Sequence, residues 1–287
     1  MKLTSFVSSL IACAVLTFPF THATAKGSDL QKLSEVLAAQ SDETKTRYEY
    51  RHPQETIEFF GIKPGMTVVE ALPGGGWYSQ ILVPYLGEKG RLVGVDYSSE
   101  LWPHFEWMNE KFLQGRKDWL ESFPENAKEW GKGQGAKTEA YTFATLPKKL
   151  TKQADAVLFI RALHNLNRFE PKGQFMTQAL NESYRMLKKG GVLGVVQHET
   201  SDANADGSTG YMEKQALINV IENAGFNLVA ESDINQNAKD KADGIVWRLP
   251  PTYSGVKDDP KQKEANKAIG ESNRMTLKFV KVGKSKR

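Results

Sequence analysis

The sequence predicts a single doubly wound α/β domain, in which helices cover both faces of an open, mostly parallel sheet. Two observations favour this class. Short apolar runs rich in Val, Leu and Ile recur along the chain, and amphipathic segments that follow glycine-containing turns alternate with them. Strands that are apolar throughout are buried on both faces, and strands that alternate with helices form parallel βαβ units.

Length and composition agree with a globular domain. The chain has 287 residues, of which 40% are hydrophobic and 25% charged, and these proportions exclude collagen-like, disulfide-framework and wholly disordered classes. The formal net charge is only +4, so no nucleic-acid partner is predicted. The basic segment 284–287 is interpreted as a solvated tail.

The first 25 residues are typical of a secretory signal peptide. Lys2 provides the positive start, an apolar run spans residues 6–18, and Ala23-Thr24-Ala25 is a small-residue cleavage site. The run is shorter than the about 20 residues that a membrane-spanning helix needs. We therefore predict cleavage after Ala25, no membrane span afterwards, and an exported, periplasmic protein.

The chain contains one cysteine, Cys13. It lies within the apolar run rather than after it, which favours an ordinary signal peptide over a lipoprotein signal. Cleavage after Ala25 would remove it and leave no disulfide, thiol nucleophile or cysteine metal site.

Residues 26–50 form a polar lead-in with one predicted helix. Three leucines recur on one face over residues 29–37, and Ser28 or Asp29 can cap the helix. The strands predicted after this lead-in are 67–72, 91–96, 138–143, 154–160, 192–196, 226–230 and 275–281.

Amphipathic helices are predicted between several of these strands. They cover 78–86, a stretch from about 172 to the pair Gly190-Gly191, and 217–224. Gly87 and Gly225 are typical of helix ends.

Two segments are longer than simple connections. The helical spacing of aromatic residues in 100–135 favours an extra helix packed on the sheet over a binding platform made by Trp102, Trp107 and Trp119. Residues 235–273 are polar and contain three prolines. Each segment is expected to be a lid or an elaboration of the surface.

Open α/β sheets bind ligands at the carboxyl ends of their strands, where the strand order reverses. The first predicted strand leads to Glu70 and the turn Gly74-Gly75-Gly76, and the second ends at Asp96. A triple-glycine turn lets the backbone approach a ligand closely and opens a helix with free N–H groups. An acid about 20 residues later can accept both hydroxyl protons of a ribose. Together these features predict a nucleoside-type cofactor.

Segment 63–79, which contains the glycine turn, resembles motif I of class I S-adenosylmethionine-dependent methyltransferases. Further segments resemble motif II, the fourth-strand motif, the turn into strand five and the entry region: 93–96, 154–158, 187–193, 51–53 and 59–61. Over most of the chain the pattern resembles a group of exported bacterial predicted methyltransferases. The resemblance implies a Rossmann-like domain over 51–283 with a seven-stranded sheet whose last strand is antiparallel.

The resemblance also implies the cofactor S-adenosyl-L-methionine and transfer of its methyl group to a small-molecule acceptor. The glycine turn and Glu70 would line the methionine and ribose end, Asp96 would hold the ribose hydroxyls, and Tyr97 would lie beside the adenine. The implied cofactor-binding residues are Glu70, Gly74, Gly75, Gly76, Asp96 and Tyr97.

The sequence departs from the family pattern in two places. Pro73 stands where motif I usually has a small, flexible residue, and the third strand ends in Phe143-Ala144 rather than in an acid that could hold the adenine amine.

Methyl transfer depends mainly on positioning, and a base is needed only where the acceptor must lose a proton. His164 and His198 follow strand ends and are the predicted bases, although either could instead fix its turn. Arg161, Asn165 and His52 are predicted to bind the acceptor; Arg161 could alternatively pair with a carboxylate, and His52 could order the entry turn. No cluster has metal-ligand spacing, so no metal is predicted.

Two other function classes stay open. The glycine turn and Asp96 are one glycine short of a dinucleotide fingerprint, which leaves a nicotinamide-dependent oxidoreductase as one alternative. The other is a non-catalytic envelope binding protein on a methyltransferase fold, because the methyl donor is made in the cytoplasm and the N-terminus predicts export.

Overall fold

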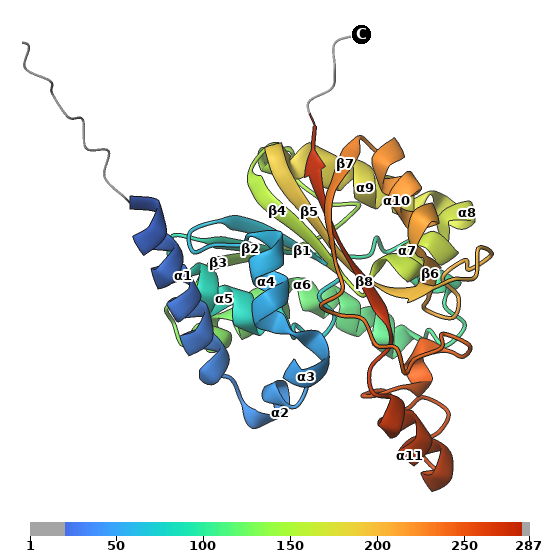
Figure 1. Ribbon diagram of the computed structural model, residues 1–287. Coiled ribbons are helices and arrows are strands. Elements are labelled where there is room, and N and C mark those ends of the chain that lie inside the picture. Colours follow the sequence, from blue (N-terminus) through green and yellow to red (C-terminus); the bar gives the residue numbers. More distant parts are fainter. Residues whose placement is uncertain (1–20, 283–287) are drawn as a thin grey trace, which may run out of the picture.

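The computed structural model describes residues 21–282 (Figure 1). The predicted signal peptide lies outside the described residues except for 21–25, and the predicted tail 284–287 lies outside them as well. Among the described residues, no helix is both long and apolar enough to cross a membrane.

The strands and helices alternate as predicted. The strands are β1 (Thr67–Ala71), β2 (Arg91–Asp96), β3 (Lys137–Thr142), β4 (Ala154–Ile160), β5 (Leu187–Thr200), β6 (Met212–Glu213), β7 (Phe226–Ser232) and β8 (Arg274–Lys281). The helices are α1 (Thr21–Ala38), α2 (Asp42–Lys45), α3 (Tyr48–Arg51), α4 (Pro53–Phe60), α5 (Ser79–Leu86), α6 (Glu110–Trp130), α7 (Leu163–Arg168), α8 (Glu170–Gly173), α9 (Phe175–Met186), α10 (Lys214–Asn223) and α11 (Pro260–Ile269).

The sheet has the order β3-β2-β1-β4-β5-β8-β7, and the two-residue strand β6 pairs with β5 beside this path. Strands β1 to β5 are parallel, whereas β8 runs antiparallel to both β5 and β7. The predicted fold class is therefore confirmed, including the antiparallel last strand; β6 is an addition. The strand order reverses at β1, which lies between β2 and β4.

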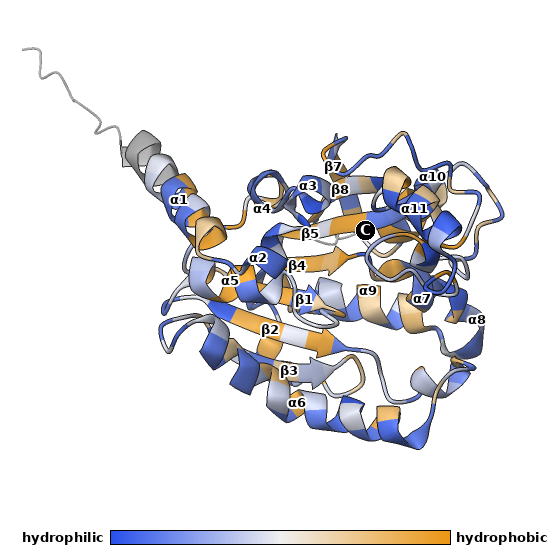
Figure 2. Ribbon diagram, turned by 90° about the horizontal axis from the view of Figure 1, so that it is seen from below, coloured by the Kyte–Doolittle hydropathy of each residue, from blue (hydrophilic) through white to orange (hydrophobic). Residues whose placement is uncertain are grey.

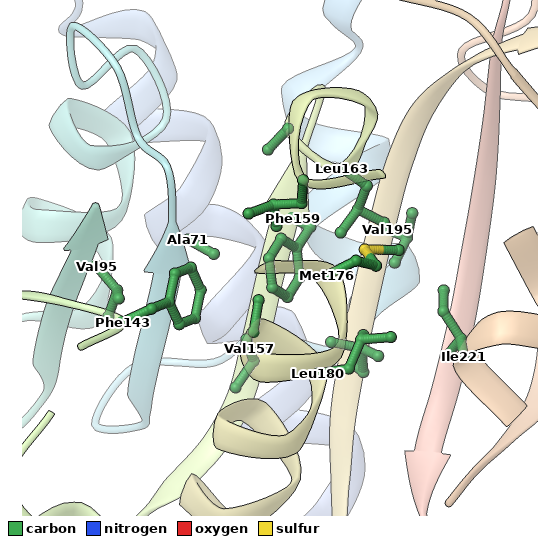
Figure 3. Packing of buried hydrophobic residues seen from close by; sticks show 14 of the residues in the cluster. Ala71, Val95, Phe143, Val157, Phe159, Leu163, Met176, Leu180, Val195 and Ile221 are labelled. Carbon is green, nitrogen blue, oxygen red and sulfur yellow. The ribbon is translucent and has the colours of Figure 1, made fainter. Parts of the chain in front are cut away.

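The central strands are buried on both faces, as their sequences predict. In β4, Val157 and Phe159 face a core built with helices α7, α9 and α10 (Figure 3), whereas Ala156 and Leu158 face a second core built with α1, α4, α5 and α6. Figure 2 shows the apolar strands in the middle of the molecule and the hydrophilic faces of the helices outside. This double burial makes the strands the rigid frame from which the loops of the site extend.

Helix α6 is the extra helix predicted within 100–135. Asn109 caps its N-terminus, because its side chain accepts a hydrogen bond from the Phe112 amide at 2.9 Å. Its residues Trp119 and Phe123 are buried, and Phe123 fills the space above Gly94 of β2, where a Cβ would lie 2.5 Å from its ring. The helix therefore packs closely on the sheet.

Two predicted boundaries are wrong. Helix α9 ends at Met186, and Leu187 already pairs with Ala154 of β4, so that Gly190-Gly191 lies within β5 instead of closing the helix. Sheet pairing overrides the local helical pattern here. Helix α1 also starts before Ser28 and Asp29, so these residues lie inside the helix and do not cap it.

Candidate functional site

A pocket of about 720 Å³ lies at the carboxyl ends of β1, β2 and β4, where the strand order reverses. Its volume is typical of small-molecule sites. The predicted site residues that line it are Glu70, Gly74, Gly75, Asp96, Tyr97, Arg161, His164, Asn165 and His198. Residues predicted from separate strand ends thus meet at one cavity.

Two predicted site residues do not line this pocket. Gly76 has a left-handed φ of 77°, and a Cβ at this position would lie 2.5 Å from the ring of Trp130, so this glycine makes room for the end of α6. His52 has a φ of 40° and joins α3 to α4. The cofactor role of Gly76 and the acceptor role of His52 stay predictions, without a pocket contact to support them.

The turn after β1 is open toward the pocket. Gly74 and Gly75 are exposed, both line the pocket, and a Cβ at either would meet nothing within 4 Å. A ligand can therefore approach the backbone of this turn closely.

Glu70, at the end of β1, is a buried carboxyl group. Its side chain is 3% exposed, and the Ser79 hydroxyl donates a hydrogen bond to its Oε2 at 2.6 Å. Burial raises the pKa of Glu70 to about 7, although the bond from Ser79 opposes this shift. The protonation state of Glu70 therefore changes near neutral pH.

Asp96, at the end of β2, is paired with Arg116 of α6. The Nε atom of Arg116 donates to Asp96 Oδ2 at 2.8 Å, and Nη2 bonds the same oxygen. The guanidinium also lies over the rings of Trp102 and Trp119, 5.3 and 5.2 Å from their centroids. Burial raises the pKa of Asp96, and Arg116 opposes that shift. A ribose bound here would share the carboxylate with Arg116.

Two buried polar atoms on the pocket wall have no partner within residues 21–282. Asn165 donates through Nδ2 to the Tyr97 hydroxyl at 3.0 Å, but its Oδ1 is unpaired. The indole Nε1 of Trp77 is also buried and unpaired. Because buried polar groups are nearly always hydrogen-bonded, these two atoms are candidate ligand contacts.

His164 and His198 lie side by side, with ring centroids 5.6 Å apart. Burial, and after it the charge of Arg161, lowers the pKa of His164 to about 4 and that of His198 well below its usual value, so both rings are neutral at pH 7. His198 uses both nitrogens, bonding Ser272 through Nδ1 and Arg161 through Nε2. His164 bonds Gln197 through Nδ1, and among the described residues its Nε2 has no partner.

Four arginines surround the single carboxylate of Glu271, and we call this group the arginine cluster. Oε1 contacts Arg47 Nη2 at 3.0 Å and Arg51 Nε at 3.4 Å; Oε2 contacts Arg161 Nη1 at 3.2 Å and Arg274 Nη1 at 3.3 Å. Burial alone would raise the pKa of Glu271, but the four guanidiniums lower it to about 2.

The pairing of Arg161 with a carboxylate is the alternative that the sequence left open, and its partner is Glu271. The other members of the arginine cluster and Arg116 are the parts of the site that the sequence did not predict. Arg47 and Glu271 are 224 positions apart, and Arg116 lies in the aromatic insertion, 20 positions after Asp96. No local pattern marks such partners.

A second pocket of about 570 Å³ adjoins the first and shares Asn165, Trp247 and Thr252 with it. Apart from Arg168 of α7, its other walls come from the two long segments, including Trp107, which is 56% exposed, and Ile245. These segments therefore build the outer part of the site, while Trp119 packs in the core.

No protein-family model and no curated protein matches the chain. Among solved structures, the [4+2]-cyclase SpnF is similar with a TM-score of 0.50 and 16% identity, over 91% of this chain and 96% of that one. A SAM-dependent methyltransferase from Aquifex aeolicus has a TM-score of 0.48 and 15% identity, over 87% of this chain and 98% of that one. A didemethyltoxoflavin N1-methyltransferase from Burkholderia thailandensis, with bound S-adenosylhomocysteine, has a TM-score of 0.45 and 13% identity, over 95% of this chain and 94% of that one.

The chain shares its fold with the [4+2]-cyclase SpnF, and its sheet is mostly parallel with one antiparallel strand, β8. Within this fold, the residues at the switch point fit a nucleoside cofactor. The open turn at Gly74 and Gly75 leaves space for one, Glu70 and Asp96 are acids at the adjacent strand ends, and Trp77 offers an unused buried donor.

Proposed function

We propose that the chain binds S-adenosyl-L-methionine at the carboxyl ends of β1 and β2 and transfers its methyl group to a small-molecule acceptor that binds toward β4 and β5. The observation that carries this proposal is the open turn at Gly74 and Gly75, which faces one pocket together with Glu70 and Asp96. When bound, the cofactor supplies an electrophilic methyl group on a sulfonium.

The residues of this chain would divide the work of binding. The Gly74-Gly75 backbone would lie against the cofactor, Glu70 would face its cationic amino group, and Asp96 would accept from the ribose hydroxyls. Each group lines the pocket. Holding donor and acceptor in this geometry is the main source of acceleration for such a transfer.

On the acceptor side, His164 would orient the attacking atom. Its Nδ1 accepts a hydrogen bond from the Gln197 side-chain amide, so the neutral ring carries its proton on Nε2. Nε2 has no partner among the described residues and can donate a hydrogen bond to an oxygen or a lone-pair nitrogen of the acceptor. A pKa of about 4 makes it a weak base, which favours orientation over full removal of a proton. His198 would act as a positioning residue because both of its nitrogens are already bonded.

The oxidoreductase alternative has less support. The third glycine of the dinucleotide fingerprint is replaced by Ser79, whose hydroxyl bonds Glu70. The non-catalytic binding protein is favoured by one observation, the pairing of Asp96 with Arg116, which occupies part of the carboxylate.

Calorimetric titration with S-adenosylhomocysteine tests the proposal. We expect the wild-type protein to bind it, and Asp96→Ala to weaken binding by about 1.5–3 kcal/mol, the usual effect of losing a hydrogen bond to a charged group. Glu139→Ala, which also removes an arginine-paired acid but lies outside the pocket, should leave affinity unchanged. No heat with methyl donor or product would favour the binding protein, and stabilisation by NAD alone would favour the oxidoreductase.

We also propose that the chain is exported to the periplasm. The support is the positive start, apolar run and cleavage site of its first 25 residues. Amino-terminal sequencing of protein from a periplasmic fraction should begin at Lys26. Recovery of the intact amino terminus from the cytoplasm would contradict this.

A further inference from the structure

The arginine cluster has an excess of positive charge beside the pocket. Four guanidiniums share one carboxylate, and three of the arginines, Arg47, Arg51 and Arg161, line the pocket itself. Arg274 is hydrogen-bonded elsewhere, to the carbonyls of Ser272 and Tyr50. The charge that Glu271 does not balance therefore lies on the three arginines that line the pocket. Because buried charges are costly unless they are paired, an anion bound in the pocket would stabilise this arrangement.

Specific donors in the cluster remain unused. Within residues 21–282, Arg51 donates only through Nε, and Arg161 only through Nε and Nη1. The terminal nitrogens Nη1 and Nη2 of Arg51 and Nη2 of Arg161 have no acceptor there. The Arg51 guanidinium is also held in place over the Trp77 ring, 4.5 Å from its centroid.

No other acid on the pocket wall compensates this charge. Asp96 is paired with Arg116, and Glu70 is bonded to Ser79 at the end of β1. Glu43 is exposed to solvent. Burial lowers the pKa of Arg51 to about 10 and of Arg161 to about 9, so both stay charged at neutral pH.

We propose that the methyl acceptor is an anion, whose carboxylate or phosphate group binds between Arg51 and Arg161. Arginine donors suit such planar or branched oxyanions. Arg161 directly follows β4 and contacts His198 of β5, whereas the cofactor residues follow β1 and β2, so the anion lies on the acceptor side. This inference rests on the proposed function. The carboxylate of the methyl donor itself is the other anion that could bind these two arginines.

The experiment titrates inorganic phosphate, at constant ionic strength, into protein saturated with S-adenosylhomocysteine. We expect wild-type protein to bind phosphate, with a change in tryptophan fluorescence because Trp77 lies against Arg51. Arg161→Gln should weaken phosphate at least about tenfold, the effect of losing one hydrogen bond to a charged group. Arg91→Gln is the matched control, since it removes an arginine paired with Glu139 outside the pocket; it should change affinity less than about twofold.

A second arm identifies the source of the anion. S-adenosylhomocysteine and 5′-methylthioadenosine, which lacks the amino-acid part, are titrated into wild type and Arg161→Gln. Unchanged affinity for both supports an anionic acceptor. The inference is overturned if Arg161→Gln weakens S-adenosylhomocysteine alone, if S-adenosylhomocysteine blocks phosphate, or if phosphate binding does not depend on Arg161.

Failure of the proposed function gives a different result. Wild-type protein would then not bind S-adenosylhomocysteine at all, while phosphate titrated into the unliganded protein would still show whether the cluster holds an anion. Arg161→Gln should fold, because three arginines remain around Glu271. Arg51→Gln, which removes the other arginine of the proposed anion site and also leaves three arginines around Glu271, serves as a second variant and should also weaken phosphate. Unchanged phosphate affinity in Arg51→Gln would overturn the inference in the same way as unchanged affinity in Arg161→Gln.

Discussion

Replacing Glu271 by glutamine should lower the free energy of unfolding by about 3–5 kcal/mol at pH 7, the usual effect of removing one partner of a buried ion pair. The carboxylate is 2% exposed and is shared by four arginines. Glutamine keeps the shape but removes the negative charge, so that four guanidiniums repel one another without a counter-charge. Urea denaturation followed by circular dichroism measures the loss.

Glu139→Gln is the matched control for this change. Glu139 also pairs with two cations, Arg91 and Lys149, but its side chain is 31% exposed, so we expect the free energy of unfolding to fall by about 1 kcal/mol or less.

The pKa of Glu271 is lowered to about 2 in the folded state. Its stabilisation is therefore present above its ordinary pKa and is lost as the pH falls toward 2. A loss below about 1 kcal/mol for Glu271→Gln would show that the arginines find other partners.

Glu70→Gln should stabilise the protein, by up to about 3 kcal/mol at pH 8 and by much less at pH 5. Burial raises the folded-state pKa of Glu70 from 4.5 to about 7. Between these values the folded state binds more protons than the unfolded state, so the free energy of unfolding falls as the pH rises. Glutamine cannot ionise, and its carbonyl oxygen can still accept the bond from Ser79.

The measurement is the difference in unfolding free energy between Glu70→Gln and wild type at the two pH values. His164 and His198 also make the protein less stable as the pH falls, because their pKa values are lowered in the folded state. Both proteins contain these histidines, so their contribution cancels when the two free energies are subtracted. The same difference at pH 5 and pH 8 would mean that Glu70 is already ionised at pH 5.

In the wild type, S-adenosylhomocysteine should also bind more tightly at pH 8 than at pH 6, because the ionised carboxylate of Glu70 attracts the amino group of the ligand.

The sequence determined the frame of this protein. Strands β1, β2 and β4 were predicted to within one residue because a run that is apolar throughout can be buried only between two layers. The boundary between α9 and β5 was not predicted correctly, because Leu187 follows the helical pattern but is held extended by pairing with β4. Local pattern reports burial, whereas strand pairing depends on residues far away in the chain.

The sequence also determined which strand ends carry polar groups. Glu70, Asp96 and Arg161 were predicted from strand position, because the carboxyl ends of parallel strands meet at one edge of the sheet. His198 was expected to follow the fifth strand, but β5 continues to Thr200 and His198 lies within it, paired with Arg274 of β8. Only the tertiary structure decided the partners and charge states of these groups. The pairing of Asp96 with Arg116, for example, depends on how α6 packs across the sheet.

The arginine cluster is the clearest case of what the tertiary structure decides. It joins the segments around Arg47, Arg161 and Glu271, which are widely separated in the chain. Arg161 was predicted from its place after β4, but nothing in the sequence marks Arg47 or Glu271 as its neighbours. The shared carboxylate and the excess positive charge arise only when packing removes these groups from water, because desolvation and Coulomb attraction depend on distances that no local pattern contains.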